Sequence, residues 1–344
     1  MLVRAPEGPN SGPGRTLCPG TVPEMDDRRH DTGRGLGELE VVARLRSRLS
    51  GLSGPEEVHL GDDTAVLSPG SGKVLFAADL VVEGVHFDLA IGTAADAGWK
   101  VVAANVSDVA AMGGVATHCV VGVAAAPGSD LEGLFDGLQA ASAAYGIGLV
   151  GGDLSRAPVL VVCVSILGET GLGPAVLRSG AGPGDELWCT GPLGGSAAGL
   201  EGLRAGRLGP DDPLARAYLR PLARPAEGRL AAGIGASAMI DVSDGLALDA
   251  TRLAEESGVG IELDEVPVAA GASEEQALGG GEDYELLFAV RAGTQVEESF
   301  EAAGLRRPVR VGTCTADATR RTLRGEPLPP LGWVHDLGAP GKGS

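Results

Sequence analysis

Long apolar runs, aromatic residues and lysine are all scarce in this chain. No stretch of 18 or more apolar residues occurs, so the sequence predicts no membrane-spanning helix. Aromatic residues make up only 3% of the chain, which disfavours a single-strand nucleic-acid binder built on base stacking. The lysines are Lys73, Lys100 and Lys342, so few are available to supply the lysine of a phosphate-binding loop.

Acidic residues dominate the charge. The 46 Asp and Glu residues outnumber the 27 Lys and Arg residues, for a formal net charge of −19. Such a surface repels phosphate backbones and anionic lipids, so we expect neither a nucleic-acid partner nor a membrane-surface role. The five cysteines form no C-x-x-C pair and sit largely in apolar runs. They are therefore predicted to be packed thiols of a cytoplasmic protein rather than zinc ligands or disulfides.

The length of 344 residues favours two domains. Residues 1–34 are rich in Pro, Gly and Arg and are predicted to be a disordered extension. Residues 35–170 then form an N-terminal domain and residues 171–344 a C-terminal one, because the composition turns Gly-rich near the boundary. Predicted strands alternate with predicted helices, which indicates an α/β or α+β fold. The helices include Ala95–Met112, Leu131–Tyr145 and Leu246–Ser257, and Gly260–Leu263 is one of the strands.

Most of the acids follow predicted strands beside small residues that leave their carboxylates accessible, whereas Asp79 interrupts an apolar strand and Asp108 follows Ser107 in a helical stretch. These positions include Asp62, Asp63, Asp79, Asp108, Asp153, Asp241, Asp244, Glu282 and Asp283. Carboxylates that converge in the fold would need cations, since each charge pair at ~4 Å costs several kcal/mol at a dielectric near 20. They are also the ligands that magnesium prefers. The alternative is local capping, because Ser243-Asp244 precedes a predicted helix and Ser107-Asp108 could act similarly.

Magnesium in proteins usually bridges to substrate phosphates, so the acids suggest phosphoryl transfer. Gly70–Lys73 lacks the early Gly and the following Ser or Thr of a P-loop, and the protein-kinase motif set is also missing. Arg178 is the best candidate for additional positive charge. No Ser, Cys or His pair indicates a covalent intermediate, which favours direct in-line transfer.

Six motifs together resemble those of one family. They are Gly61–Leu67 (G-D-D-T-A-V-L), Asp79–Phe87 (D-L-V-V-E-G-V-H-F), Asn105–Gly113 (N-V-S-D-V-A-A-M-G), Gly151–Asp153 (G-G-D), Asp241–Leu246 (D-V-S-D-G-L) and Gly280–Phe288 (G-G-E-D-Y-E-L-L-F). The chain is similar through them to thiamine-monophosphate kinases, which belong to the aminoimidazole-ribonucleotide-synthetase-like superfamily. The resemblance runs from about residue 36 to Trp333.

This resemblance implies a two-domain synthetase-like fold, in which an N-terminal α/β domain dimerises through its sheet and packs against a C-terminal α/β domain. It also implies that ATP and several Mg²⁺ ions are used to phosphorylate thiamine monophosphate to thiamine diphosphate. A homodimer with its site in the cleft between the domains is the expected assembly.

The resemblance assigns roles to individual residues. The metal positions it implies are Asp63, Ala77, Ala78, Asp79, Asp108, Asp153, Asp241 and Asp244. The positions along the ATP phosphates are Gly152, Asp153, Arg178 and Ser243, and those at the thiamine substrate are His86, Glu282 and Trp333. Ala77 and Ala78 replace hydroxyl residues of the family pattern, so a metal contact there must come from a backbone carbonyl. The alternative roles are a half-buried strand residue for His86 and a tail anchor for Trp333.

Other functions remain open from the residues alone. Relatives within the superfamily act on other substrates, among them the purine-pathway synthetase, selenophosphate synthetase and a hydrogenase-maturation protein. The latter two usually need a reactive Cys, and Cys18 lies in the predicted extension without a lysine partner. A non-catalytic acidic cation-binding protein and a two-metal phosphatase are the alternatives from other classes.

Overall fold

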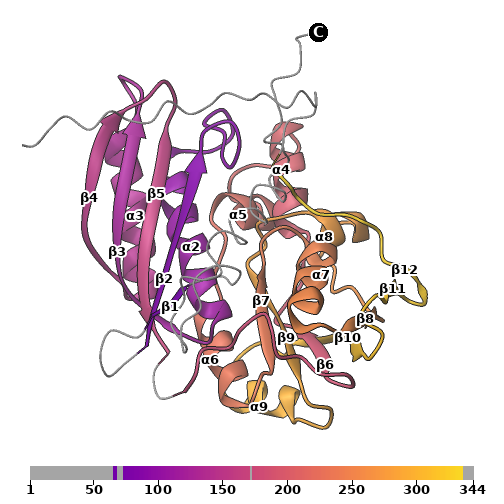
Figure 1. The fold of residues 1–344 in the computed structure, drawn as a ribbon. Helices are drawn as coiled ribbons and strands as arrows, with labels where there is room; N and C mark the ends of the chain where they lie inside the picture. Colours follow the sequence, from indigo (N-terminus) through magenta and orange to yellow (C-terminus); the bar gives the residue numbers. More distant parts are fainter. Residues whose placement is uncertain (1–64, 68–72, 171–172, 336–344) are drawn as a thin grey trace, which may run out of the picture. The chain divides into compact units, whose positions relative to one another are not determined.

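The computed structural model describes residues 65–67, 73–170 and 173–335, which belong to one compact unit. Asp62, Asp63 and the predicted extension over residues 1–34 lie outside the described residues. The helices and strands are labelled as in Figure 1. Within the described residues, no helix is both long and apolar enough to cross a membrane.

The first half of the described chain forms a five-stranded sheet. Its strands are β1 (Ala65–Leu67), β2 (Val74–Val82), β3 (Val115–Ala125), β4 (Gly148–Arg156) and β5 (Val161–Glu169). The strand order is β1-β2-β5-β3-β4, and β3 and β4 are the parallel neighbours in an otherwise antiparallel sheet. The edge strands are therefore β1 and β4, and β2 lies three strands from β4.

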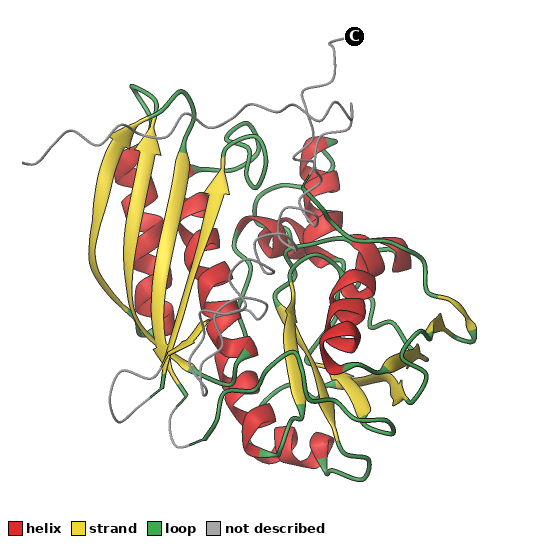
Figure 2. Ribbon diagram, viewed as in Figure 1, coloured by secondary structure: helices red, strands yellow, loops and turns green. Residues whose placement is uncertain are grey.

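Two helices, α2 (Ala94–Ala111) and α3 (Leu131–Tyr145), cover one face of this sheet (Figure 2). Helix α2 begins with a capping box, in which Thr93 and Asp96 each accept a hydrogen bond from the other's backbone N–H. Alternate β5 residues such as Val162 and Val164 are fully buried against the helices. Their neighbours face the opposite side, because successive side chains of a strand alternate between its faces.

The opposite face of the same sheet is apolar, and none of the described helices covers it. Its exposed or partly exposed large side chains include Phe76, Leu80, Val120 and Leu167. Each of these is at least 40% exposed, although each is apolar. A contiguous apolar face of this kind is typical of an interaction surface.

The second half forms a seven-stranded sheet in the order β12-β11-β8-β10-β6-β9-β7. Its strands are β6 (Glu186–Cys189), β7 (Ala238–Val242), β8 (Gly260–Leu263), β9 (Glu285–Val290), β10 (Val309–Thr315), β11 (Arg321–Leu323) and β12 (Glu326–Pro327). Its helices are α4 (Gly195–Arg204), α5 (Pro213–Leu219), α6 (Pro225–Gly233), α7 (Leu246–Ser257), α8 (Glu274–Gly279) and α9 (Val296–Ala302).

Strand β9 explains why this second sheet needs helices on both faces. All of its residues are buried, and they alternate between two cores. Leu287 and Ala289 pack with residues of α7 and α8, whereas Leu286 and Phe288 pack with residues of α6 and α9. The second core also contains Ala110 and Ala111 from the end of α2, so α2 packs against both sheets.

These two helix-covered sheets confirm the predicted α/β (α+β) class. One local expectation was wrong: Gly152 and Asp153 lie inside strand β4, not after a strand end. A glycine pair within an exposed edge strand resembles a turn in the sequence, because it breaks the apolar alternation that marks a strand. The short helices α5, α8 and α9 and the strands β10, β11 and β12 were not predicted.

Candidate active site

Two buried polar residues of α2 connect the helix to both sheets. The Asn105 side-chain oxygen accepts a hydrogen bond from the backbone N–H of Asp79 on β2, at 3.2 Å. Two residues further along, on nearly the opposite side of the helix, the Ser107 hydroxyl donates to the Asp241 carboxylate on β7, at 2.7 Å. Asn105 and Ser107 are fully buried and Asp241 is almost so. The N-x-S-D motif thus joins two of the acids that the sequence selected.

Tyr284 marks where these acids converge. Its pKa is well above the usual range because it is buried, and because the negative charges of nearby carboxylates oppose ionisation of its hydroxyl. Those carboxylates belong to Glu282, Asp79, Asp241 and Asp108. Four acids from β2, α2, β7 and the loop before β9 are therefore close enough to influence one buried group.

The loop that carries Glu282 and Tyr284 is conformationally strained. Glu282 and Tyr284 have φ values of 65° and 51°, in the left-handed region that non-glycine residues rarely adopt. Their backbone N–H groups donate to the carbonyls of Ser243 and Val242, at 2.7 and 3.0 Å. A Cβ on Gly281 would lie 2.5 Å from the Ser243 carbonyl oxygen, so this close approach requires glycine. The glycines of G-G-E-D-Y thereby allow Glu282 to reach the end of β7.

Asp244 lies in an ion-pair cluster at the start of α7. Arg252 donates to the carboxylates of both Asp244 and Asp249, at 2.5 and 2.8 Å. The Asp244 backbone N–H also donates to Asp249, at 2.9 Å. Burial and the neighbouring Asp244 carboxylate raise the pKa of Asp249 to about 7, and the charges of Arg252 and Arg178 oppose that rise. Arg178 is therefore close to this cluster, as is expected of a residue that supplements its charge.

His86 and Glu282 lie together around the buried Lys100. The Lys100 ammonium donates to Glu282 at 2.7 Å and to the backbone carbonyl of His86 at 3.1 Å. Burial lowers the pKa of His86, against the opposing effect of the Glu282 carboxylate. Its Nδ1 accepts a hydrogen bond from the Val82 backbone N–H, at 3.1 Å. His86 is half-buried, as the alternative expected, but it lies in a turn after β2 rather than in the strand.

The C-terminal segment returns to the same place. The Trp333 backbone N–H donates to the carbonyl of Asp244, at 2.9 Å. His335 is edge-on to the Trp333 ring, with centroids 5.9 Å apart, and its ring lies 5.2 Å from that of His86. The Trp333 side chain is 53% exposed, so its ring remains accessible to a ligand.

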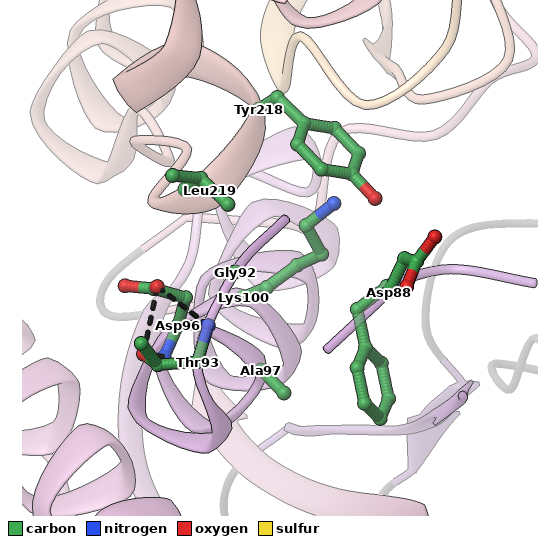
Figure 3. A pocket seen from close by; sticks show the side chains of 9 residues that line it. Asp88, Gly92, Thr93, Asp96, Ala97, Lys100, Tyr218 and Leu219 are labelled. Carbon is green, nitrogen blue, oxygen red and sulfur yellow. Dashed lines mark hydrogen bonds between the residues drawn. The ribbon is translucent and has the colours of Figure 1, made fainter. Parts of the chain in front are cut away.

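A cavity of about 10 Å³ lies beside Lys100, between the loop after β2, the start of α2 and α5 (Figure 3). This volume holds about one water molecule and is too small for a substrate. Figure 3 shows the Lys100 side chain ending beside the Tyr218 ring, and the ammonium lies 3.7 Å from the ring centroid. Lys100 is therefore enclosed rather than exposed to a binding pocket.

Gly152 and Asp153 are the predicted site residues that do not join the others. Asp153 pairs with Gly122 on β3, Gly122 pairs with Cys163 on β5, and Cys163 pairs with Leu80 on β2. Residues paired in this way point to the same face of the sheet, and Leu80 is on the uncovered face. Asp79 is next to Leu80 and therefore faces the other side. Three strand spacings, about 14 Å, also separate β4 from β2. Within one chain, Asp153 cannot share an ion with Asp79.

The described acids do not by themselves form a finished metal site. Within residues 65–67, 73–170 and 173–335, no three His, Cys, Asp or Glu side chains are grouped closely enough to hold an ion. Asp63 lies outside this part of the chain. Ala77 and Ala78 pair with β5, and neither has a side-chain oxygen to offer. The donor chemistry of Asp79, Asp108 and Asp241 nevertheless fits a hard divalent cation such as Mg²⁺, which often has only one or two protein carboxylates.

Comparison with known proteins identifies the family. Residues 61–170 match the family described as AIR synthase related protein, N-terminal domain, and residues 182–323 match its C-terminal domain. The chain is 38% identical to the thiamine-monophosphate kinase of Mycobacterium tuberculosis over 270 residues, 73% of this chain and 80% of the relative. It is 36% identical to that of Bacillus subtilis over 264 residues, 71% and 79% of the two chains. The chain belongs to the thiamine-monophosphate kinase family.

A solved structure of the family has the same fold. It is described as AaThiL complexed with AMPPCP and TMP, and it superposes with a TM-score of 0.76 at 31% identity. The superposition covers 87% of this chain and 97% of the other. The chain therefore shares both its sequence family and its architecture with a protein whose structure is described as a complex with AMPPCP and TMP.

Sequence reasoning missed several residues that contact the predicted ones. Asn105 and Ser107 lie inside a quoted motif, and their buried polar side chains on an apolar helix were a usable signal. Lys100 offered the same signal, since it is a rare lysine within an apolar helix. Asp249 and Arg252 gave none, because an acid and a base three residues apart usually form an exposed helix pair.

Proposed function

We propose that this protein is a thiamine-phosphate kinase that uses ATP and Mg²⁺ to convert thiamine monophosphate to thiamine diphosphate. The single observation that carries the proposal is the position of Glu282. It lies among the acids around Tyr284, and it is paired with Lys100 beside His86. Acids that could bind cations, and through them phosphates, thus lie next to the residues around Lys100 that could bind an organic substrate. The names of the relatives support the same reaction.

The proposed metal ligands are Asp79, Asp108 and Asp241, together with Asp63 and Asp244. When bound, Mg²⁺ would neutralise charge on the transferring phosphates. Asp241 is oriented for this role by the Ser107 hydroxyl. Asp244 is held by Arg252, so Arg252 would keep its carboxylate in place before the substrates bind. Ala77 and Ala78 would contribute only through backbone carbonyls.

The proposed substrate contacts are those around the C-terminal segment. His86 and Glu282 would bind the thiamine moiety, and the accessible Trp333 ring would stack on one of its aromatic rings. Arg178 and Ser243 would lie along the ATP phosphates. The Arg178 charge lowers the pKa of Asp249, which supports a position of Arg178 near the start of α7.

We propose direct in-line transfer, in which a phosphate oxygen of thiamine monophosphate attacks the γ-phosphorus of ATP. The new P–O bond forms as the bond to ADP breaks, and ADP leaves with the electron pair. A phosphate acceptor is already anionic near neutral pH, so it needs little help from a general base. The protein would act by positioning the two substrates and by reducing their mutual repulsion.

A homodimer is part of the proposal. The apolar face that includes Phe76, Leu80 and Val120 is exposed, and burying it against a second copy would be favourable. Because Asp153 faces that side, its carboxylate could act along the ATP phosphates only if a second copy supplies it, and the adjacent Gly152 would come with it on the same strand β4. A cytoplasmic location also stays a prediction, with which the free thiols of the described cysteines are compatible.

The direct test is incubation with ATP, Mg²⁺ and thiamine monophosphate, followed by chromatographic separation of the products. Formation of thiamine diphosphate and ADP in equal amounts is expected. Release of inorganic phosphate from thiamine monophosphate would support the two-metal phosphatase instead. Binding of Mg²⁺ without binding of a non-hydrolysable ATP analogue, measured by calorimetry, would support the non-catalytic cation-binding protein.

Two variants test the residue roles. Asp244→Asn should lower turnover by orders of magnitude while the circular dichroism spectrum is unchanged. Near-normal turnover at saturating Mg²⁺ would show that Asp244 has no part in catalysis. If Asp153 acts in a second copy, an equal mixture of inactive Asp153→Asn and Asp244→Asn subunits should recover roughly a quarter of wild-type activity after exchange, since half of the dimers are mixed and each has one intact site. No recovery would contradict the shared site.

A further inference from the structure

Lys100 is fully buried, yet it contacts two of the residues that the proposed function places at the thiamine substrate. Its side chain is 1% exposed, and its ammonium lies 2.7 Å from Glu282 Oε2 and 3.1 Å from the His86 carbonyl oxygen. Burying an ammonium is costly unless charge and hydrogen bonds compensate for the lost water. The fold therefore maintains Lys100 at this position by specific contacts, and none of them is needed to form helix α2.

Tyr218 completes the enclosure of Lys100. Its ring lies 3.7 Å from the ammonium, a distance that allows a cation–π interaction. The Tyr218 hydroxyl is 3.4 Å from the same His86 carbonyl oxygen that accepts from Lys100. The ammonium is thus held between a carboxylate, a carbonyl and an aromatic face, and it has little freedom to move.

Glu282 is the partner through which Lys100 can influence a ligand. The Glu282 side chain is 23% exposed, so solvent or a ligand reaches it where it does not reach Lys100. Lys100 binds Oε2, and among the described residues Oε1 makes no hydrogen bond. The backbone of Glu282 is in the strained left-handed conformation, so the loop alone does not provide a low-energy position for this side chain.

We propose that Lys100 is a positioning residue that fixes the Glu282 carboxylate and the His86 turn for thiamine monophosphate, a role that rests on the proposed function. Lys100 does not touch the substrate, because it is enclosed and the adjoining cavity of about 10 Å³ holds no more than a water molecule. It acts by directing one oxygen of Glu282 inwards, which leaves the other oxygen facing the ligand.

The test compares Lys100→Met, Glu282→Gln and the double variant in steady-state kinetics and in calorimetric binding of thiamine monophosphate. Misplacement of a binding group by about 1 Å can cost up to a hundredfold. We expect Lys100→Met to raise the KM and Kd for thiamine monophosphate at least tenfold, with the KM for ATP and kcat changed less than about threefold. The double variant should bind no more weakly than Glu282→Gln, because Lys100 acts through Glu282.

The matched control is Trp99→Phe, one position earlier on α2. The Trp99 indole N–H donates to the Pro221 carbonyl, at 2.8 Å, and has no contact with Glu282. This variant should lower the melting temperature but leave the KM for thiamine monophosphate unchanged. An equal KM increase in Trp99→Phe and Lys100→Met, at equal loss of stability, would show that Lys100 has only a structural role.

The outcomes separate this inference from the proposed function. If the wild type forms thiamine diphosphate but Lys100→Met binds thiamine monophosphate with unchanged Kd, the positioning role is wrong and the function stands. Additive losses in the double variant would also overturn the role. If the wild type neither binds nor phosphorylates thiamine monophosphate, the proposed function is wrong and the positioning role falls with it.

Discussion

Asp283 should make the stability of this protein depend on pH near neutrality. Helix α4 begins at glycines, with no side-chain cap of its own. Asp283 supplies that cap from the loop before β9, since its carboxylate accepts from the backbone N–H groups of Gly194 and Ser196, at 2.5 and 3.1 Å. Burial raises the pKa of Asp283 from 3.8 to about 7, and these amide donors limit the rise.

The sign follows from the two pKa values. Folded Asp283 binds its proton more tightly than the unfolded chain does, so protonation favours the folded state. This contribution is complete below about pH 4 and is lost as the pH rises through about 7. A shift of about three units corresponds to at most ~4 kcal/mol. Because Asp283 is only partly buried, we expect a smaller loss, about 2 kcal/mol between pH 5 and pH 8.

The assay is urea unfolding of the wild type and of Asp283→Asn from pH 5 to pH 8. The variant cannot ionise at this position, so its free energy of unfolding should fall about 2 kcal/mol less over that range. Taking the difference between the two proteins removes the contribution of the other titrating groups, including Asp249. A difference that stays constant with pH, or one that changes in the opposite direction, would refute the raised pKa of Asp283.

Three further predictions concern buried contacts. Glu285→Gln should lower the free energy of unfolding by about 3 kcal/mol, measured by urea denaturation, because the buried carboxylate accepts from Arg224 at 2.7 Å and from other donors; an unchanged midpoint would contradict it. Gly137→Ala should cost about 2 kcal/mol by the same measurement, since its Cβ would lie 2.0 Å from the Ala95 carbonyl oxygen of α2; Ala at an exposed helix position is the control. Ser107→Ala should cost ~1–3 kcal/mol and also lower kcat, because Asp241 loses a donor; a stability loss with normal kcat would argue against a site role for Asp241.

Elements with strong local signals were predictable. The structure has helices at Leu131–Tyr145 and Leu246–Ser257 and a strand at Gly260–Leu263, as the sequence predicts. Both helices end at a glycine in the left-handed conformation, Gly146 and Gly258, which is a stop signal visible in the sequence. The helices α5, α8 and α9 were missed because they have no more than seven residues, too few to show a periodic apolar pattern.

The motifs selected acids most of which come together in the fold, but they did not predict which face of a strand each acid occupies. Asp79, Asp108, Asp241 and Glu282 converge on Tyr284, but Asp153 faces the other side of its sheet. The motif could not reveal this difference, because the face of a strand residue depends on its register with neighbouring strands. A shift of one residue would exchange the two faces.

The sequence alone determined the types of the longer secondary-structure elements, the excess of acids, the absence of a P-loop motif and the family. Each of these depends on residue identity or short spacing, which the chain carries without folding. Only the tertiary structure decided that Lys100 pairs with Glu282, 182 positions away, and that Ser107 binds Asp241, 134 positions away. Such contacts arise where α2 packs against both sheets, and the packing of buried surfaces selects them rather than any local preference of the residues involved.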